Sequence, residues 1–209
     1  MATCLTNVEF EAQFGALHDH IFRRSKWGTV FHEGSFPTGF VNPDWQVVLL
    51  CSGLAFAGYD IEGGDEYDSD FPDEYEILLD VLAERGNEEI VVAATRANAG
   101  YQESAFTCRF DIGAVRAGLV SCDVWNPWLS VFDRTGLWGL ISDYDNYGVL
   151  GGAAAIMDPY IETAGGLETI KRRFSEWAES YPEGEWLGSE LRRLYDMAGW
   201  HDVTVERVT

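Results

Sequence analysis

The feature that most constrains the fold is a pair of β-like runs that only three residues separate. Residues 129–133 and 137–142 flank the connection Arg134-Thr135-Gly136. A three-residue connection that contains glycine is typical of a β-hairpin, whose strands pair antiparallel. A parallel pair would need a crossover of roughly a dozen residues or more. The chain is therefore expected to build an antiparallel sheet around this hairpin.

Other segments supply further strands. Residues 45–51 and 89–95 are short, continuous apolar runs, which favour buried strands. Residues 105–111 alternate between apolar and polar side chains, as a half-buried strand does. A last strand is expected at residues 202–208, whereas the glycine- and proline-rich stretch 26–44 predicts a loop or a short edge strand.

Apolar residues at helical spacing predict four helices. The first runs from Thr6, with Glu9 at capping-box spacing, to Arg23 and Arg24, where cations suit the helix dipole. The second follows Pro72. The stripes of the last three helices are Tyr75, Leu78, Leu79 and Leu82; Leu167, Ile170, Phe174 and Trp177; and Leu191, Leu194, Tyr195 and Ala198. The pattern predicts one α+β domain over residues 1–209, with a mostly antiparallel central sheet and about four flanking helices.

Cysteine and histidine give no sign of a metal, a cofactor or an oxidising compartment. His18 and His20 are two residues apart on the first helix and point to different faces, so they cannot share a zinc ion. No signal peptide is visible, and no apolar run approaches the ~18 residues of a membrane span. A cytoplasmic protein with reduced cysteines is expected. The cysteines are Cys4, Cys51, Cys108 and Cys122, of which Cys51 and Cys108 fit small core positions.

The charge of the chain limits its partners. The sequence has 35 Asp and Glu against 14 Lys and Arg, a net charge of -21, which would repel nucleic acids and anionic membranes. Eleven acids and no base fall between residues 60 and 84. Such crowding destabilises a fold by self-repulsion, and a cationic protein partner would offset it. The alternatives are a solvated loop and helix face, or a metal site.

A calcium loop fails on spacing. Asp143, Asp145 and Gly148 fit the first, third and sixth positions of an EF-hand loop, but Tyr147 and Ala154 occupy positions that need oxygen ligands. The aromatic side chains beside these acids, Tyr144 and Tyr147, can instead bind Arg or Lys of a partner by stacking and cation–π contact. We expect this polar segment to be an exposed loop. The predicted partner-binding residues are Asp60, Glu62, Asp65, Glu66, Asp68, Asp70, Asp73, Glu74, Asp143, Tyr144, Asp145 and Tyr147.

One tract carries a family resemblance. Residues 131–142 (Val-Phe-Asp-Arg-Thr-Gly-Leu-Trp-Gly-Leu-Ile-Ser), followed by Gly-Val-Leu-Gly-Gly at 148–152, resemble a tract in small acidic bacterial proteins. Some of these are similar to immunity proteins of polymorphic or contact-delivered toxin systems. The resemblance covers roughly a tenth of the chain and transfers no catalytic residue. It implies an antitoxin that neutralises a cognate toxin, or another basic protein, by covering its active site or substrate groove.

Two other functions remain open at this point. The density of acids also fits a small enzyme with carboxylate acid–base chemistry, with or without a metal. A scaffold module whose acidity maintains solubility is the third hypothesis. The sequence has no serine-nucleophile motif and no phosphate-binding glycine motif, so no catalytic residue is assigned.

Overall fold

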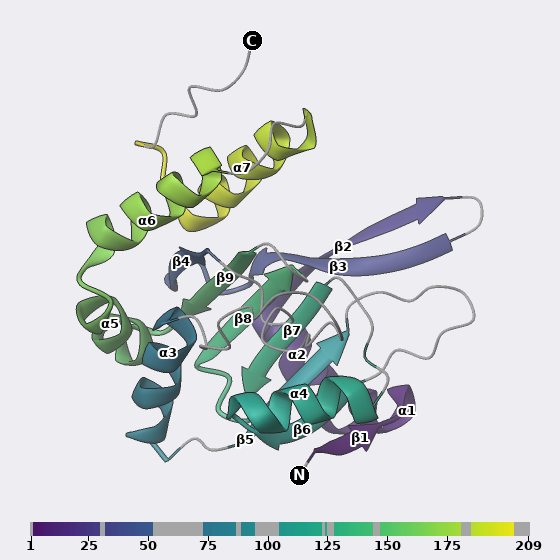
Figure 1. The fold of residues 1–209 in the computed structure, drawn as a ribbon. Coiled ribbons are helices and arrows are strands. Elements are labelled where there is room, and N and C mark those ends of the chain that lie inside the picture. Colours follow the sequence, from purple (N-terminus) through teal and green to yellow (C-terminus); the bar gives the residue numbers. More distant parts are fainter. Residues whose placement is uncertain are drawn as a thin grey trace, which may run out of the picture.

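A computed structural model describes residues 2–29, 32–51, 73–86, 89–94, 105–122, 124, 128–143, 147–180 and 185–202. Its centre is a seven-stranded sheet with the order β1-β6-β5-β7-β8-β9-β4, and every neighbouring pair is antiparallel (Figure 1). The prediction of an α+β fold with an antiparallel sheet is confirmed. The strands of this sheet are β1 (Thr3–Leu5), β4 (Gln46–Leu50), β5 (Glu89–Ala94), β6 (Ala105–Arg109), β7 (Trp128–Asp133), β8 (Trp138–Asp143) and β9 (Tyr147–Gly152).

Helices pack on both faces of the sheet. On one face, Phe132 contacts Phe14 and Phe22, which belong to the N-terminal helical segment and the strand after it. On the other face, Gly148 lies against Tyr75 of α3. The last two helices pack against the edge strand β4. The helical elements are α1 (Asn7–Phe10), the π-helix η1 (Glu11–Gly15), α2 (Ala16–Ile21), α3 (Asp73–Ala83), α4 (Ile112–Ser121), α5 (Ala154–Thr163), α6 (Leu167–Ser180) and α7 (Glu185–Ala198).

The predicted central hairpin is confirmed as β7 and β8. Asp133 is 2% exposed, and its Oδ1 accepts hydrogen bonds from the backbone N–H groups of Thr135 and Gly136 at 2.9 and 3.1 Å. Gly136 has a φ of 65°, which favours glycine because the left-handed region strains other residues. A buried carboxylate therefore holds the turn that the sequence pattern predicted.

The first helix begins as expected but ends early. The side chain of Thr6 accepts from the backbone N–H of Glu9, and Glu9 accepts from that of Thr6, so the capping box is confirmed. The helical segment ends at Ile21, and Arg23 lies in a strand rather than in a last helical turn. Of the two possibilities for residues 26–44, a loop or a short edge strand, the loop is wrong for most of the stretch, because β2 (Phe22–Thr29) and β3 (His32–Phe40) pair with each other as a two-stranded sheet.

The later helices follow their apolar stripes. α3, α6 and α7 confirm the predicted ones, and Gly86 and Gly199 follow α3 and α7 with positive φ values of 71° and 68°. Helix α4 was not predicted, and α5 occupies an apolar stretch to which no helix was assigned. The expected strand at 202–208 lies outside the described residues, apart from its first residue.

The cysteines correct the expectation of a fully reduced protein. Cys4 of β1 and Cys122 after α4 form a disulfide, with Cα atoms 5.3 Å apart and a sequence separation of 118. Cys51 and Cys108 are free thiols, and Cys108 is buried as predicted. Among the described helices, none combines the length and hydrophobicity that crossing a membrane requires.

Candidate partner-binding surface

The structure describes only some of the predicted partner-binding residues. Asp73 begins α3 and Asp143 ends β8. Glu74 and Tyr147 are described with their side chains, and both positions differ from what was expected. The residues that lie outside the described ranges are Asp60, Glu62, Asp65, Glu66, Asp68, Asp70, Tyr144 and Asp145.

Glu74 is not part of an exposed acidic face. It is 9% exposed, and its Oε2 accepts a hydrogen bond from the backbone N–H of Cys51 at 2.9 Å. Burial, followed by the charge of Glu74, raises the pKa of Cys51, Tyr75 and Tyr160 above their ordinary values. The thiol and phenol groups around Glu74 therefore stay protonated near neutral pH, so Cys51 is a poor nucleophile. Glu74 ties α3 to the end of β4, which is a structural role.

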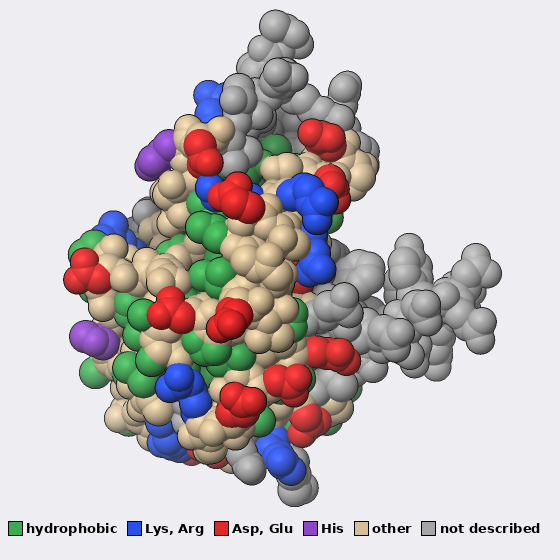
Figure 2. Space-filling view, turned by 90° about the vertical axis from the view of Figure 1, so that its left-hand side faces the viewer, with side chains coloured by type: hydrophobic (Ala, Val, Ile, Leu, Met, Phe, Trp, Pro, Cys, Tyr) green, Lys and Arg blue, Asp and Glu red, His purple; other side chains and the backbone are tan. Residues whose placement is uncertain are grey.

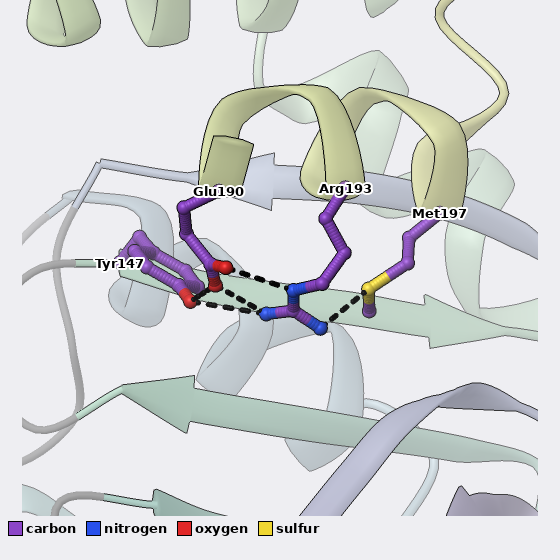
Figure 3. A network of polar contacts seen from close by, with 4 residues as sticks. All are labelled: Tyr147, Glu190, Arg193 and Met197. Carbon is purple, nitrogen blue, oxygen red and sulfur yellow. Dashed lines mark hydrogen bonds and ion pairs between the residues drawn. The ribbon is translucent and has the colours of Figure 1, made fainter. Parts of the chain in front are cut away.

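Tyr147 is also buried, contrary to the prediction of an exposed loop. It lies in β9 and is 1% exposed. Its hydroxyl donates to Glu190 of α7, and Arg193 donates to the same hydroxyl at 3.2 Å (Figure 3). Arg193 also donates through Nε to Glu190 at 3.0 Å and through Nη1 to Met197 Sδ at 3.2 Å. Tyr147 thus fastens α7 to the sheet and is not available to a partner.

Glu190 and Arg193 each stabilise the charged form of the other. Burial alone would raise the pKa of Glu190, but hydrogen bonds from Arg193 and Tyr147 outweigh burial and lower it below its ordinary 4.5. Arg193 keeps its charge because the bond to Glu190 offsets its own burial and raises its pKa. The ion pair is therefore formed at neutral pH and holds α7 in place.

The exposed acids of α3 form a stripe. Glu76 and Asp80 are four residues apart, and Glu84 follows at the same spacing just beyond the helix, where its N–H still donates to Asp80 at 3.0 Å. This spacing places all three on one side of the helix. All three are exposed, and no ion pair or hydrogen bond links their side chains to another described residue.

Helix α5 extends this surface. It packs beside α3 and carries exposed Asp158 and Glu162, again four residues apart. Asp158 accepts from Gln46 Nε2 at 2.8 Å, whereas Glu162 has no such contact with the described residues. Figure 2 faces the side of the molecule that carries α3, α5 and α6, and acidic side chains gather in its lower half. We call Glu76, Asp80, Glu84, Asp158 and Glu162 the α3–α5 acidic surface.

The α3–α5 acidic surface has five acids, and the exposed Arg85, which directly follows Glu84, offsets part of their charge. Helix α6 carries the three successive bases Lys171, Arg172 and Arg173, of which Lys171 pairs with Glu168 at 3.2 Å and with Asp202 at 2.9 Å. Like charges four residues apart on a helix cost a few tenths of a kcal/mol per pair. An opposite charge from outside the chain would remove that cost and gain charge-assisted hydrogen bonds. This surface is therefore the described region best suited to bind a cationic group.

Sequence reasoning located only part of this surface. The acidic stripe of α3 falls inside the acid-rich window 60–84, but the prediction did not take account of the four-residue spacing that places these acids on one side of a helix. Asp158 and Glu162 were missed because no helix was assigned there. Their spacing was the available signal, and it becomes informative once α3 and α5 are known to lie side by side.

Neither metal binding nor known relatives add to this picture. Within the described ranges, no three His, Cys, Asp or Glu side chains lie close enough together to hold a metal ion. The chain matches no protein-family model, and it matches no curated protein and no solved structure. The case for a function therefore depends on this chain's own charges and contacts.

Proposed function

We propose that the protein is an immunity-type inhibitor that binds and neutralises a cognate toxin. The observation that carries the proposal is the α3–α5 acidic surface, since exposed carboxylates that form no ion pair with the described residues favour a cationic partner. The net charge of -21 supports the same conclusion. The resemblance of residues 131–142 and 148–152 to immunity proteins suggests that this partner is a toxin.

Inhibition would work by occlusion. Carboxylates of the acidic surface would pair with the Arg and Lys side chains that hold the toxin's own anionic substrate. For a toxin that cleaves nucleic acid, the carboxylates would take the places of phosphates. Long-range attraction between the two charged surfaces would make association fast and strongly dependent on salt.

The disulfide bears on where this encounter takes place. Disulfides persist in oxidising compartments and are rare in the cytoplasm. The bond between Cys4 and Cys122 therefore favours an oxidising compartment over the cytoplasmic location predicted from the sequence. In that case the toxin would be met outside the cytoplasm.

The first test identifies the partner. Proteins retained from a host lysate by the immobilised chain would be expressed singly, and we expect one basic protein that arrests growth alone but not together with this chain. A retained protein that is harmless when expressed alone would contradict the proposal.

The second test locates the contact with matched charge variants. Neutralising Glu76, Asp80 and Glu84 to Gln, Asn and Gln should slow association with the toxin roughly tenfold at low salt. A variant of the acidic tract, with Asp65, Glu66, Asp68 and Asp70 changed to Asn or Gln, tests the neighbouring segment. The control variant makes the same change in net charge elsewhere, with Glu11, Asp44 and Asp196 changed to Gln, Asn and Asn. If the control slows association as much as the α3 variant does, the α3–α5 acidic surface is not the contact.

A further inference from the structure

The pair β2 and β3, which we call the β2–β3 arm, projects away from the body of the molecule (Figure 1). Among the described strands, these two pair only with each other, from Phe22 opposite Phe40 at the base to Thr29 opposite His32 at the tip. Eight extended residues reach about 26 Å. A two-stranded hairpin alone is marginally stable in water. A partner surface would supply the stability that such an arm lacks.

The base of the arm is firmly attached to the sheet. Gly139 and Gly151 are cross-strand neighbours in β8 and β9, and the rings of Phe22 and Phe40 lie directly against them. A Cβ atom on Gly151 would stand 2.4 Å from the ring of Phe40. The N–H of Val41 also donates to the carbonyl of Ile21 at 2.9 Å and closes the base. The direction of the arm is therefore set by packing in the core.

The arm differs in charge from the rest of the chain. Its sequence holds three bases, Arg23, Arg24 and Lys26, against the single acid Glu33, a local charge of +2 in a chain of -21. A positively charged arm fits an acidic surface. Pairing of its strand edges with another strand is disfavoured, because Pro37 has no N–H and the register shifts between Arg23 and Arg24.

We propose that the β2–β3 arm of one chain docks on the α3–α5 acidic surface of a second copy. Within one chain the two cannot meet, because the arm extends from the sheet face that packs on Phe22 and Phe40, whereas α3 covers the opposite face (Figure 1). The contact joins two different surfaces, so it is head-to-tail and can form rings or longer chains. It requires only the opposite charges of the two surfaces and does not depend on the existence of a toxin.

Sedimentation velocity of the full-length chain tests the proposal. We expect the wild type to self-associate as its concentration rises in about 50 mM salt, and about 500 mM salt to weaken association by roughly tenfold or more. One variant reverses the arm (Arg23, Arg24 and Lys26 to Glu), and the other reverses the surface (Glu76, Asp80 and Glu84 to Lys). Each should be monomeric alone, and an equimolar mixture should associate because each arm again meets an opposite charge. Circular dichroism checks that both variants fold.

Several outcomes would overturn the proposal. These are a wild type that stays monomeric at low salt, a mixture that fails to associate, or association that neither salt nor either variant changes. The last result would indicate pairing through strand edges. An arm that binds anionic vesicles or duplex DNA while the wild type stays monomeric would assign it a different partner. The arm-reversed variant should still bind a toxin, so failure of this inference is distinguishable from failure of the proposed function.

Discussion

Replacing Gly151 by Ala should loosen the attachment of the β2–β3 arm. The new Cβ would lie 2.4, 2.6 and 2.9 Å from three ring atoms of Phe40. Carbon atoms in contact stand ~3.5–4.0 Å apart, so the ring must withdraw by about 1 Å. It has little room, because Phe40 is 7% exposed and packs between Phe22 and Trp45 at centroid distances of 5.8 and 5.5 Å.

The expected cost of Gly151→Ala is that of an overpacked core, about 1–3 kcal/mol. For a chain of this size, each kcal/mol lowers Tm by roughly 2–4 °C. Thermal unfolding gives the stability, and hydrogen exchange of the arm's backbone amides, which should become faster, reports the attachment. Gly113→Ala is the control, since its Cβ would meet nothing closer than an atom at 3.5 Å and alanine favours a helix.

A double variant separates the clash from any other effect of the substitution. If Gly151→Ala destabilises the protein by a clash with the Phe40 ring, the same substitution should reduce stability only slightly in a chain that already carries Phe40→Ala. The reasoning is refuted if Gly151→Ala leaves both Tm and arm exchange unchanged, or if its cost is the same with and without the ring.

Three other perturbations test the contacts that hold the fold. Because the pKa of Glu190 is lowered in the folded state, its contribution to stability is complete above the unfolded value of 4.5 and disappears as pH falls through the folded pKa. The Tm difference between wild type and Glu190→Gln should therefore shrink below pH 4.5, and a constant difference would contradict the ion pair. Breaking the Cys4–Cys122 disulfide by Cys4→Ser and Cys122→Ser should cost about 2–5 kcal/mol in chemical unfolding, since it closes a long loop. An equal denaturation midpoint for oxidised wild type and the double variant would argue against the bond. Asp133→Ala should cost about 1–3 kcal/mol because it leaves the buried turn amides without an acceptor, and retained stability would show that water replaces the carboxylate.

The parts of the fold that the sequence predicted depend on local signals. The β7–β8 hairpin follows from the short connection that contains Gly136, and α3 follows from an apolar stripe that ends near Gly86. In each case neighbouring residues supply both the periodicity and the turn. A local pattern is sufficient there because the element's ends and its buried face are encoded in the same short segment.

The arm could not be predicted in the same way. Glycine and proline between residues 26 and 44 indicate a loop, and no apolar alternation marks two strands. Its base is held by Gly139 and Gly151, which follow more than ninety residues later in the chain. The pairing of Cys4 with Cys122 is equally remote in sequence. Such contacts become visible only when the sheet order is known.

The predicted site shows a similar division between charge and position. The sequence identified an excess of acids correctly, but a carboxylate's charge does not reveal whether the fold buries it. Glu74 and Glu76 are two residues apart on one helix, yet Glu74 accepts a backbone N–H and Glu76 is exposed. The prediction that Tyr147 is exposed was wrong for a related reason. Its acidic neighbours in the sequence suggested a loop, whereas its own side chain is buried in the core.

The two proposals share the α3–α5 acidic surface, and this has a consequence for the free protein. If the arm of a second copy and a toxin dock on the same carboxylates, they must compete for them. Self-association would then shield these acids while no toxin is present, which reduces the repulsion that an exposed stripe of like charges imposes. A toxin that binds these carboxylates more tightly than the arm does would displace the arm. If both proposals hold, opposite charge on two separate parts of one acidic chain would reconcile storage of an inhibitor with rapid binding of its target.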